Sequence, residues 1–163
     1  MDLFPWLLFA HVLGAIIAFG PTFSSPIIGR LGAQNPAHGN FAMRVSRELA
    51  RVQILPLAIV QGITGLGLII TRDIDVTRAT WLMVAIVLYL TAIGFAIVIQ
   101  TPRAKRIIAM TTPPPGAPAP SGPPAGGPPP ALLAEIKKIK QGGMLLIGLI
   151  VAIVFLMVVK PTF

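Results

Sequence analysis

Four long apolar stretches, at residues 3–28, 53–70, 80–100 and 142–159, constrain this chain more than any other feature. None of them contains an Asp, Glu, Lys or Arg. The hydrocarbon core of a bilayer is about 30 Å thick, and a helix needs about 20 apolar residues to cross it. Charged residues make up only 11% of the chain and lie in short groups between the stretches. We therefore expect an all-α membrane protein, a four-transmembrane-helix bundle that forms one integral membrane domain over residues 1–163.

The ends of these expected helices carry secondary signals. The first stretch is too long for a cleaved signal peptide, and Asp2 stands where a signal has positive charge, so we expect an uncleaved helix. Pro26, beside Ser24 and Ser25, is expected to end this helix early, and Pro21 and Pro56 are expected to bend the helices that contain them. The amphipathic segments at 40–52 and 131–141 are expected to be helices that extend the second and fourth spans, the latter lying on lipid headgroups.

The distribution of Lys and Arg predicts the orientation. Segments 30–52 and 101–141 contain ten Lys and Arg residues, whereas the connections on the other side contain only Arg72, Arg78 and Lys160. By the positive-inside rule, both termini lie outside and the two basic segments face the cytoplasm, an N-out/C-out topology in a bacterial plasma membrane. The net charge of +8 also suits nucleic acid. Because the cations directly follow apolar stretches, we expect anionic lipids at the cytoplasmic face as their partner and no nucleic acid.

The second cytoplasmic connection contains a proline- and glycine-rich tract at residues 111–130. Ten of its twenty residues are proline and four are glycine. Such a composition cannot bury a core, so we expect a disordered loop with polyproline II character.

Small residues at helical spacing predict the faces on which the helices pack. Lipid provides no hydrophobic drive for helices to associate, so contact faces are enriched in Gly and Ala. The expected packing residues are Gly14 and Ala18 on the first helix, Ala58, Gly62 and Gly65 on the second, Ala92 and Ala96 on the third, and Gly148 and Ala152 on the fourth.

His11 is the one histidine inside an apolar stretch, and three interpretations of it stay open. It can hydrogen-bond between helices together with Gln61, or it can be an axial ligand of a b-type haem, with Gly14 making room for the ring. Copper, with methionine as a second ligand, is the third. The other histidine, His38, lies in a connection, which excludes bis-histidine ligation. The chain has no cysteine, so disulfides, iron–sulfur clusters and thiolate zinc sites are excluded.

The sequence contains no motif of a hydrolase or of a nucleotide-driven machine, so we predict no catalytic residues. An ion-coupled carrier normally has ionisable residues inside its spans, and these spans have none. We therefore expect a non-enzymatic protein, a structural or accessory subunit of a membrane assembly or a homo-oligomer. The alternative is a haem-binding membrane redox protein with His11 as the ligand.

Two segments resemble a known family. LLFAHVLGAIIAFGPTF (7–23) and LPLAIVQGITGLGLII (55–70) are similar to the first two helices of small bacterial membrane proteins classed as domain of unknown function 2269. More distantly, the layout resembles the copper-resistance D-type membrane domain and the haem-binding bacterial protoporphyrinogen oxidases. In the oxidases a histidine of the first helix binds haem, and this resemblance implies that role for His11. The chain departs from the oxidases after the first helix, where SSPIIGRLG replaces a leucine-proline-arginine run, and it has no lysine in the third helix.

Overall fold

The computed structural model of the protein describes residues 2–34, 36–113 and 127–161. Their regular structure is entirely helical, in the order α1 (Phe4–Gln34), α2 (Pro36–Leu49), η1 (Ala50–Ile54), α3 (Leu55–Thr71), α4 (Thr80–Phe95), η2 (Ala96–Gln100), α5 (Thr101–Thr111) and α6 (Pro130–Val159). Adjoining elements form four rods, each long and apolar enough to cross a membrane. The expected all-α architecture with four membrane-spanning helices is therefore confirmed. Most of the proline-rich tract, residues 114–126, lies outside the described residues.

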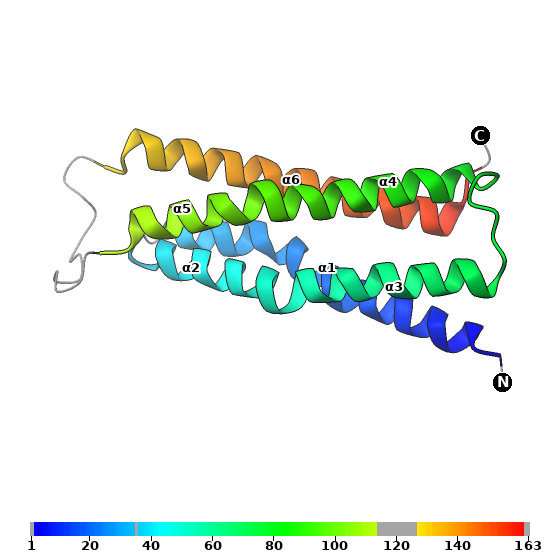
Figure 1. Ribbon diagram of the computed structural model, residues 1–163. Helices are drawn as coiled ribbons and strands as arrows, with labels where there is room; N and C mark the ends of the chain where they lie inside the picture. The colour runs from blue at the N-terminus through cyan, green and yellow to red at the C-terminus, as the bar shows by residue number, and fades with distance from the viewer. Residues whose placement is uncertain (1, 35, 114–126, 162–163) are drawn as a thin grey trace.

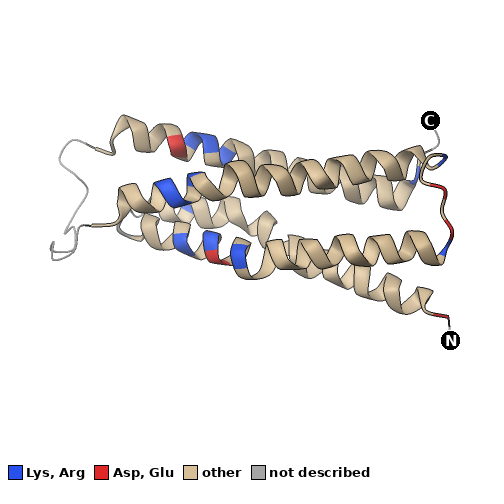
Figure 2. Cartoon of the chain, in the orientation of Figure 1, with Lys and Arg blue, Asp and Glu red and all other residues tan. Residues whose placement is uncertain are grey.

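The rods pack in two pairs. α1 lies against α2 and α3, and α4 lies against α6. The pairs meet where α2 contacts α5 and where α1 contacts α6 (Figure 1). Both described chain ends and the α3–α4 loop lie at one end of the bundle, which we call the terminal end. We call the opposite end, where α1 ends and α6 begins, the basic end, because Lys and Arg of α2, α5 and α6 gather there (Figure 2).

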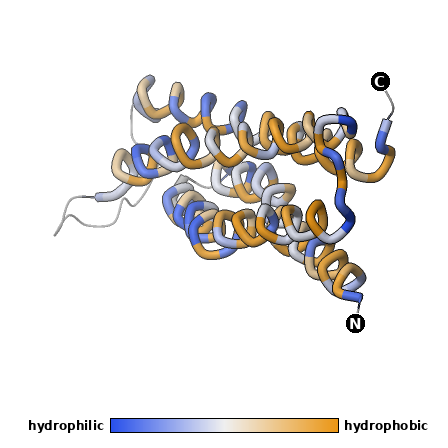
Figure 3. Tube along the Cα trace, turned by 45° about the vertical axis from the view of Figure 1, so that its right-hand side comes forward, coloured by the Kyte–Doolittle hydropathy of each residue, from blue (hydrophilic) through white to orange (hydrophobic). Residues whose placement is uncertain are grey.

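The rods are longer than the stretches predicted from hydropathy. The second and third extend through α2 and α5, and α6 starts at Pro130, twelve residues before the expected span. Hydrophilic and hydrophobic residues alternate along these extensions, whereas apolar residues dominate the helices towards the terminal end (Figure 3). The amphipathic segments at 40–52 and 131–141 are indeed helical continuations of the spans.

The expected early end of the first helix at Pro26 is wrong. α1 continues through Pro21 and Pro26 to Gln34. Its last turns pack closely on α2, where a Cβ added to Gly32 would lie 2.9 Å from the Cβ of Ala42. A proline removes one backbone hydrogen bond, and tertiary packing of this kind overrides the local cost.

Two wide helical turns occur at matching positions relative to a proline. The N–H of Leu55 donates to the carbonyl of Ala50, and that of Thr101 donates to Ala96, each five residues back. In both rods a proline, Pro56 or Pro102, follows one residue after the donor. A proline ring collides with the carbonyl four residues before it, and a wide turn relieves that collision. A bend was expected at Pro56, and the structure has a π segment directly before it.

Pro21, inside α1, explains a contact between two rods. Pro21 has no N–H, so the carbonyl of Ile17, four residues earlier, loses its usual helical donor. The side-chain amide Nε2 of Gln53, in η1, donates to that carbonyl at 2.8 Å. Since a backbone group left unpaired in lipid costs several kcal/mol, Gln53 repairs the break in α1 and joins the two rods.

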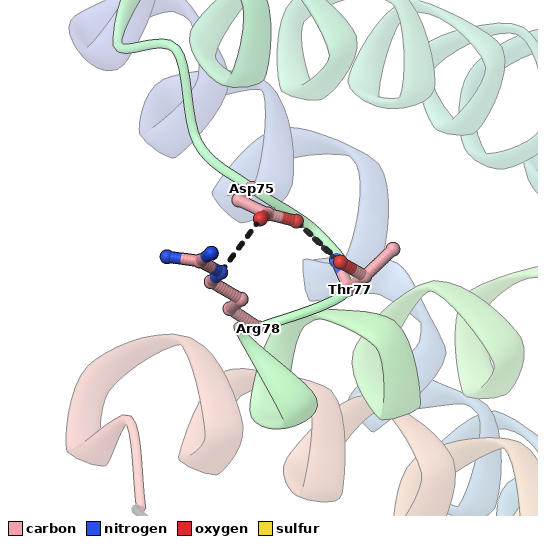
Figure 4. A network of polar contacts seen from close by, with 3 residues as sticks. All are labelled: Asp75, Thr77 and Arg78. Atoms are coloured by element: carbon pink, nitrogen blue, oxygen red, sulfur yellow. Dashed lines mark hydrogen bonds and ion pairs between the residues drawn. The ribbon is translucent and has the colours of Figure 1, made fainter.

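The terminal end is closed by local contacts. In the α3–α4 loop, Asp75 accepts hydrogen bonds from the backbone and hydroxyl of Thr77 at 3.0 and 2.5 Å and pairs with Arg78 at 3.2 Å (Figure 4). The Thr77 hydroxyl, the largest cause, holds the pKa of the exposed Asp75 carboxyl below its ordinary value. Two cation–π contacts, Arg72 on Phe4 and Lys160 on Trp81, join this loop and the end of α6 to the neighbouring helices.

The hydrogen bond from Gln53 to the Ile17 carbonyl predicts that substitutions at residues 53 and 21 have coupled effects on stability. Gln53→Leu should lower the free energy of unfolding by about 0.6–1.7 kcal/mol, the range of interhelical hydrogen bonds in a membrane. Pro21→Ala restores the missing N–H, so Gln53→Leu should cost much less in that background. Unfolding in mixed detergent micelles, followed by circular dichroism, measures all four proteins. An equal cost in both backgrounds would contradict this explanation.

Candidate functional site

A cluster of four polar side chains lies between α1, α3 and α4 in the half of the bundle near the terminal end. It comprises His11, Gln61, Thr64 and Tyr89, which we call the polar cluster. The ring Nδ1 of His11 lies 2.9 Å from the hydroxyl of Thr64, and the hydroxyl of Tyr89 donates to the carbonyl of Ala58 at 2.5 Å. Each bond joins two different rods, so the cluster links α3 to α1 and to α4.

The hydrogen bonds of Thr64 bear on the tautomer of His11. The Thr64 hydroxyl lies 3.0 Å from the carbonyl of Val60 and 3.1 Å from that of Gln61, both in its own helix. When its single hydrogen is donated to one of them, the hydroxyl can accept from Nδ1–H of His11, and in the neutral ring Nε2 then carries no hydrogen. A neutral imidazole oriented by its second nitrogen suits an interhelical bond and equally suits a metal ligand. This geometry is therefore consistent with both the hydrogen-bonding and the haem interpretations.

The three predicted glycines near His11 each make room for a polar side chain. A Cβ added to Gly65 would lie 3.2 Å from Cε1 of His11, and one added to Gly14 would lie 2.9 Å from Oε1 of Gln61. At Gly62 the distance to the Tyr89 hydroxyl would be only 2.6 Å. These contacts join a glycine of one helix to a polar side chain of another. The glycines thus serve to seat the polar cluster.

Gln61 is the most buried side chain of the polar cluster. It was predicted, like His11, to hydrogen-bond between helices, and the side-chain partner of His11 is Thr64. Gln61 is only 7% exposed, and its Oε1 has no hydrogen-bond partner among the described residues. A buried amide oxygen normally has a donor, so this oxygen is an acceptor that is open to a hydrogen bond.

The remaining predicted packing residues differ in burial. Ala18 and Ala58 are buried, whereas Ala92, Ala96 and Ala152 are half-buried. Gly148 is exposed, and a Cβ added there would meet nothing within 4 Å. The small-residue faces of α1 and α3 therefore contact helices of this chain, whereas that of α6 points partly outward.

The sequence did not single out Thr64 and Tyr89 as the residues that contact His11 and Gly62. The signal was present, since Gly62 and Gly65 flank Thr64 on one helix. In the part of the chain that the structure describes, no three His, Asp or Glu side chains gather where a metal ion could bind. Of the methionines in or beside the spans, Met83 and Met144 are 45% and 60% exposed. The haem and copper interpretations stay predictions that rest on His11.

The close contact between Gly62 and the Tyr89 hydroxyl predicts that Tyr89→Phe offsets the destabilisation caused by Gly62→Ala. Gly62→Ala should lower the free energy of unfolding by about 1–3 kcal/mol, because the new methyl group collides with the Tyr89 hydroxyl. In Tyr89→Phe the nearest ring atom of residue 89 is 3.4 Å from the added Cβ, so Gly62→Ala should cost far less there. Gly94→Ala is the matched control, because a Cβ added at Gly94 would meet nothing within 4 Å. It should be neutral or slightly stabilising, since alanine favours a helix. Equal costs of Gly62→Ala in both backgrounds would contradict the packing described.

The comparison with family models gives one match. Residues 5–161 match the family described as "Predicted integral membrane protein (DUF2269)". Neither a curated protein nor a solved structure matches the chain significantly. The family match covers all four rods and so extends well beyond the two segments that carry the resemblance in sequence. The chain is therefore a multi-pass integral membrane protein and belongs to the DUF2269 family.

Proposed function

We propose that the chain is a structural or accessory subunit of a membrane assembly, or a homo-oligomer, without catalytic activity of its own. The observation that supports this most strongly is an apolar groove on the outside of the bundle between α1 and α6. It is lined by Ala15, Ile16, Phe19, Gly20 and Phe23 of α1 and by Ile150, Val151 and Val154 of α6.

Glycine on this surface has no partner within the chain. A Cβ added to Gly20, which lines the groove, would meet nothing within 4 Å. Gly148 lies one turn before Val151 on the same side of α6 and is equally open. A lipid-facing glycine lowers helix stability by about 1 kcal/mol relative to alanine and gains nothing from lipid. Small residues do stabilise a surface on which another helix packs closely, so the groove is suited to a helix of a second chain.

The orientation also belongs to this proposal. At the terminal end the cations Arg72, Arg78 and Lys160 balance Asp2, Asp73 and Asp75, whereas the basic end holds ten Lys and Arg against Glu48 and Glu135. The entire net charge of +8 therefore lies at the basic end (Figure 2). The positive-inside rule places that end in the cytoplasm and both termini outside.

The groove can be tested by cross-linking, because the natural chain has no cysteine to interfere. Val151→Cys places one thiol in the groove, and Ile63→Cys is a control on the outer face of α3 with similar exposure. A photoactivatable cross-linker on residue 151 in native membranes should give an adduct that residue 63 does not. An adduct with the mass of two chains supports a homo-oligomer, and an adduct with another membrane protein supports an accessory role. Equal or absent adducts at both positions would contradict the proposal.

The absorption spectrum of the purified protein separates the redox alternative from this proposal. Protein from cells supplied with a haem precursor should show no Soret band if His11 only joins helices. A Soret band that His11→Ala removes would instead assign a haem to the polar cluster.

The topology has its own test. Alkaline phosphatase, which is active only outside the cytoplasm, should be active when fused after the last residue. Green fluorescent protein fused at the same position should be exported with the C-terminus and should therefore show no fluorescence. The reverse pattern would place the basic end outside and overturn the assigned orientation.

A further inference from the structure

The cations of the basic end lie in one band along the bundle. A helix rises about 1.5 Å per residue, so Arg51 lies about 30 Å and Arg44 about 40 Å from the terminal end of α3. By the same measure Lys140 lies about 29 Å from the end of α6, and Arg106 about 39 Å from the start of α4. The bilayer has a core of about 30 Å within a full thickness of about 40–45 Å. The band of cations therefore begins where a core of that thickness ends and extends across the headgroup layer.

A shallow groove runs along α2 at this depth. Its lining side chains share one face of the helix and are Phe41, Arg44, Val45, Glu48, Leu49 and Val52. Phe41 and Val52 are 68% and 66% exposed. Beyond η1, towards the terminal end, the exposed side chains of the same rod are apolar and include Ile59, Ile63 and Leu66 of α3. The groove thus extends a lipid-facing apolar stripe from the core of the bilayer into its headgroup layer.

Arg44 lines this groove and is held in position. Nε of Arg44 donates to Oδ1 of Asn40 at 2.6 Å, and its Nη2 donates to the Thr112 hydroxyl at 3.0 Å. A guanidinium has five N–H donors, so most remain available to another acceptor, and the fixed geometry reduces the entropy lost on binding. Arg47 and Arg51 follow at helical spacing. Glu48, the one acid in the groove, lies 3.8 Å from Arg51, which leaves the group a net charge of +2.

We propose that this groove binds an anionic phospholipid of the surrounding bilayer. The phosphate would contact Arg44, the arginine that lines the groove, and the first carbons of an acyl chain would lie along Val45, Leu49 and Val52. An acidic segment of a partner protein also complements the charge. Lipid is favoured because the groove opens into the lipid-facing stripe and lies at headgroup depth. The inference does not depend on the proposed function or on which leaflet the basic end occupies.

A tryptophan placed in the groove can report on the lipid beside it. The natural Trp6 and Trp81 both belong to the terminal half, so Trp6→Phe and Trp81→Phe remove the background. Val45→Trp then reports on the groove, and Ile63→Trp reports on the same rod within the bilayer core. Each protein is reconstituted in phosphatidylcholine vesicles that contain phosphatidylglycerol, with brominated acyl chains on one lipid or the other. Bromine quenches tryptophan fluorescence only at short range, so quenching measures the composition of the local lipid.

At residue 45 brominated phosphatidylglycerol should quench several-fold more than its bulk share predicts, and about fivefold for each effective cation is the upper expectation. Residue 63 should show a preference near one. Arg47→Gln with Arg51→Gln, which keeps the Asn40–Arg44–Thr112 contacts, should lower the preference at residue 45, and adding Arg44→Gln should abolish it. Arg72→Gln with Arg78→Gln, at the terminal end, should leave it unchanged.

Three results would overturn the proposal. Equal quenching by both brominated lipids at residue 45 would mean that the groove does not select an anionic lipid. The same preference at residues 45 and 63 would mean that the whole protein attracts such lipids without a site on α2. A preference that survives removal of all three arginines in a protein with unchanged circular dichroism would exclude the assigned headgroup contact.

Discussion

The need to pair every backbone polar group inside a membrane governs most of what is unusual in this bundle. Water is absent there, so a carbonyl that loses its helical donor must find another. Pro21 creates such a carbonyl at Ile17, and Gln53 supplies the donor from the next rod. Pro56 and Pro102 produce the same difficulty in the second and third rods, where wide turns shift the hydrogen bonds to residues five apart. A contact between rods and two irregular turns thus have one cause.

The same constraint shapes the polar cluster. A histidine, a threonine and a tyrosine in an apolar bundle each need a partner, and the bonds His11–Thr64 and Tyr89–Ala58 provide it between rods. Such partners can reach one another only if the helices leave space for the side chains. Gly62 and Gly65 supply that space on α3, so the glycines and the polar residues form one arrangement. Losing either half would leave a buried polar group unpaired or would force the helices apart.

Much of the fold could be predicted from the sequence. The rest, and most of the polar cluster, could not, for physical reasons. Long charge-free stretches predicted four helices because length and hydropathy alone decide whether a segment can cross a bilayer. The continuation of α1 beyond Pro26 could not be predicted, because it depends on the packing of Gly32 against Ala42 in another helix. The small-residue spacing of α3 singled out Gly62 and Gly65 but gave no indication of Tyr89. Pairing of that kind depends on the rotation of each helix about its axis, which periodicity does not fix.

The outer surface differs from the interior in a way that bears on function. Inside, glycines contact polar side chains, whereas Gly20 and Gly148 on the α1–α6 side contact nothing in this chain. The interior itself is small, since no large side chain among the described residues is fully buried. Four membrane-length rods that bury so little against one another leave most of their faces for lipid or for other chains. Because small residues gain little from lipid and much from a close helix, the open glycines support the proposal that protein covers the α1–α6 side, whereas Arg44 in the groove of α2 supports the proposal of a bound lipid there.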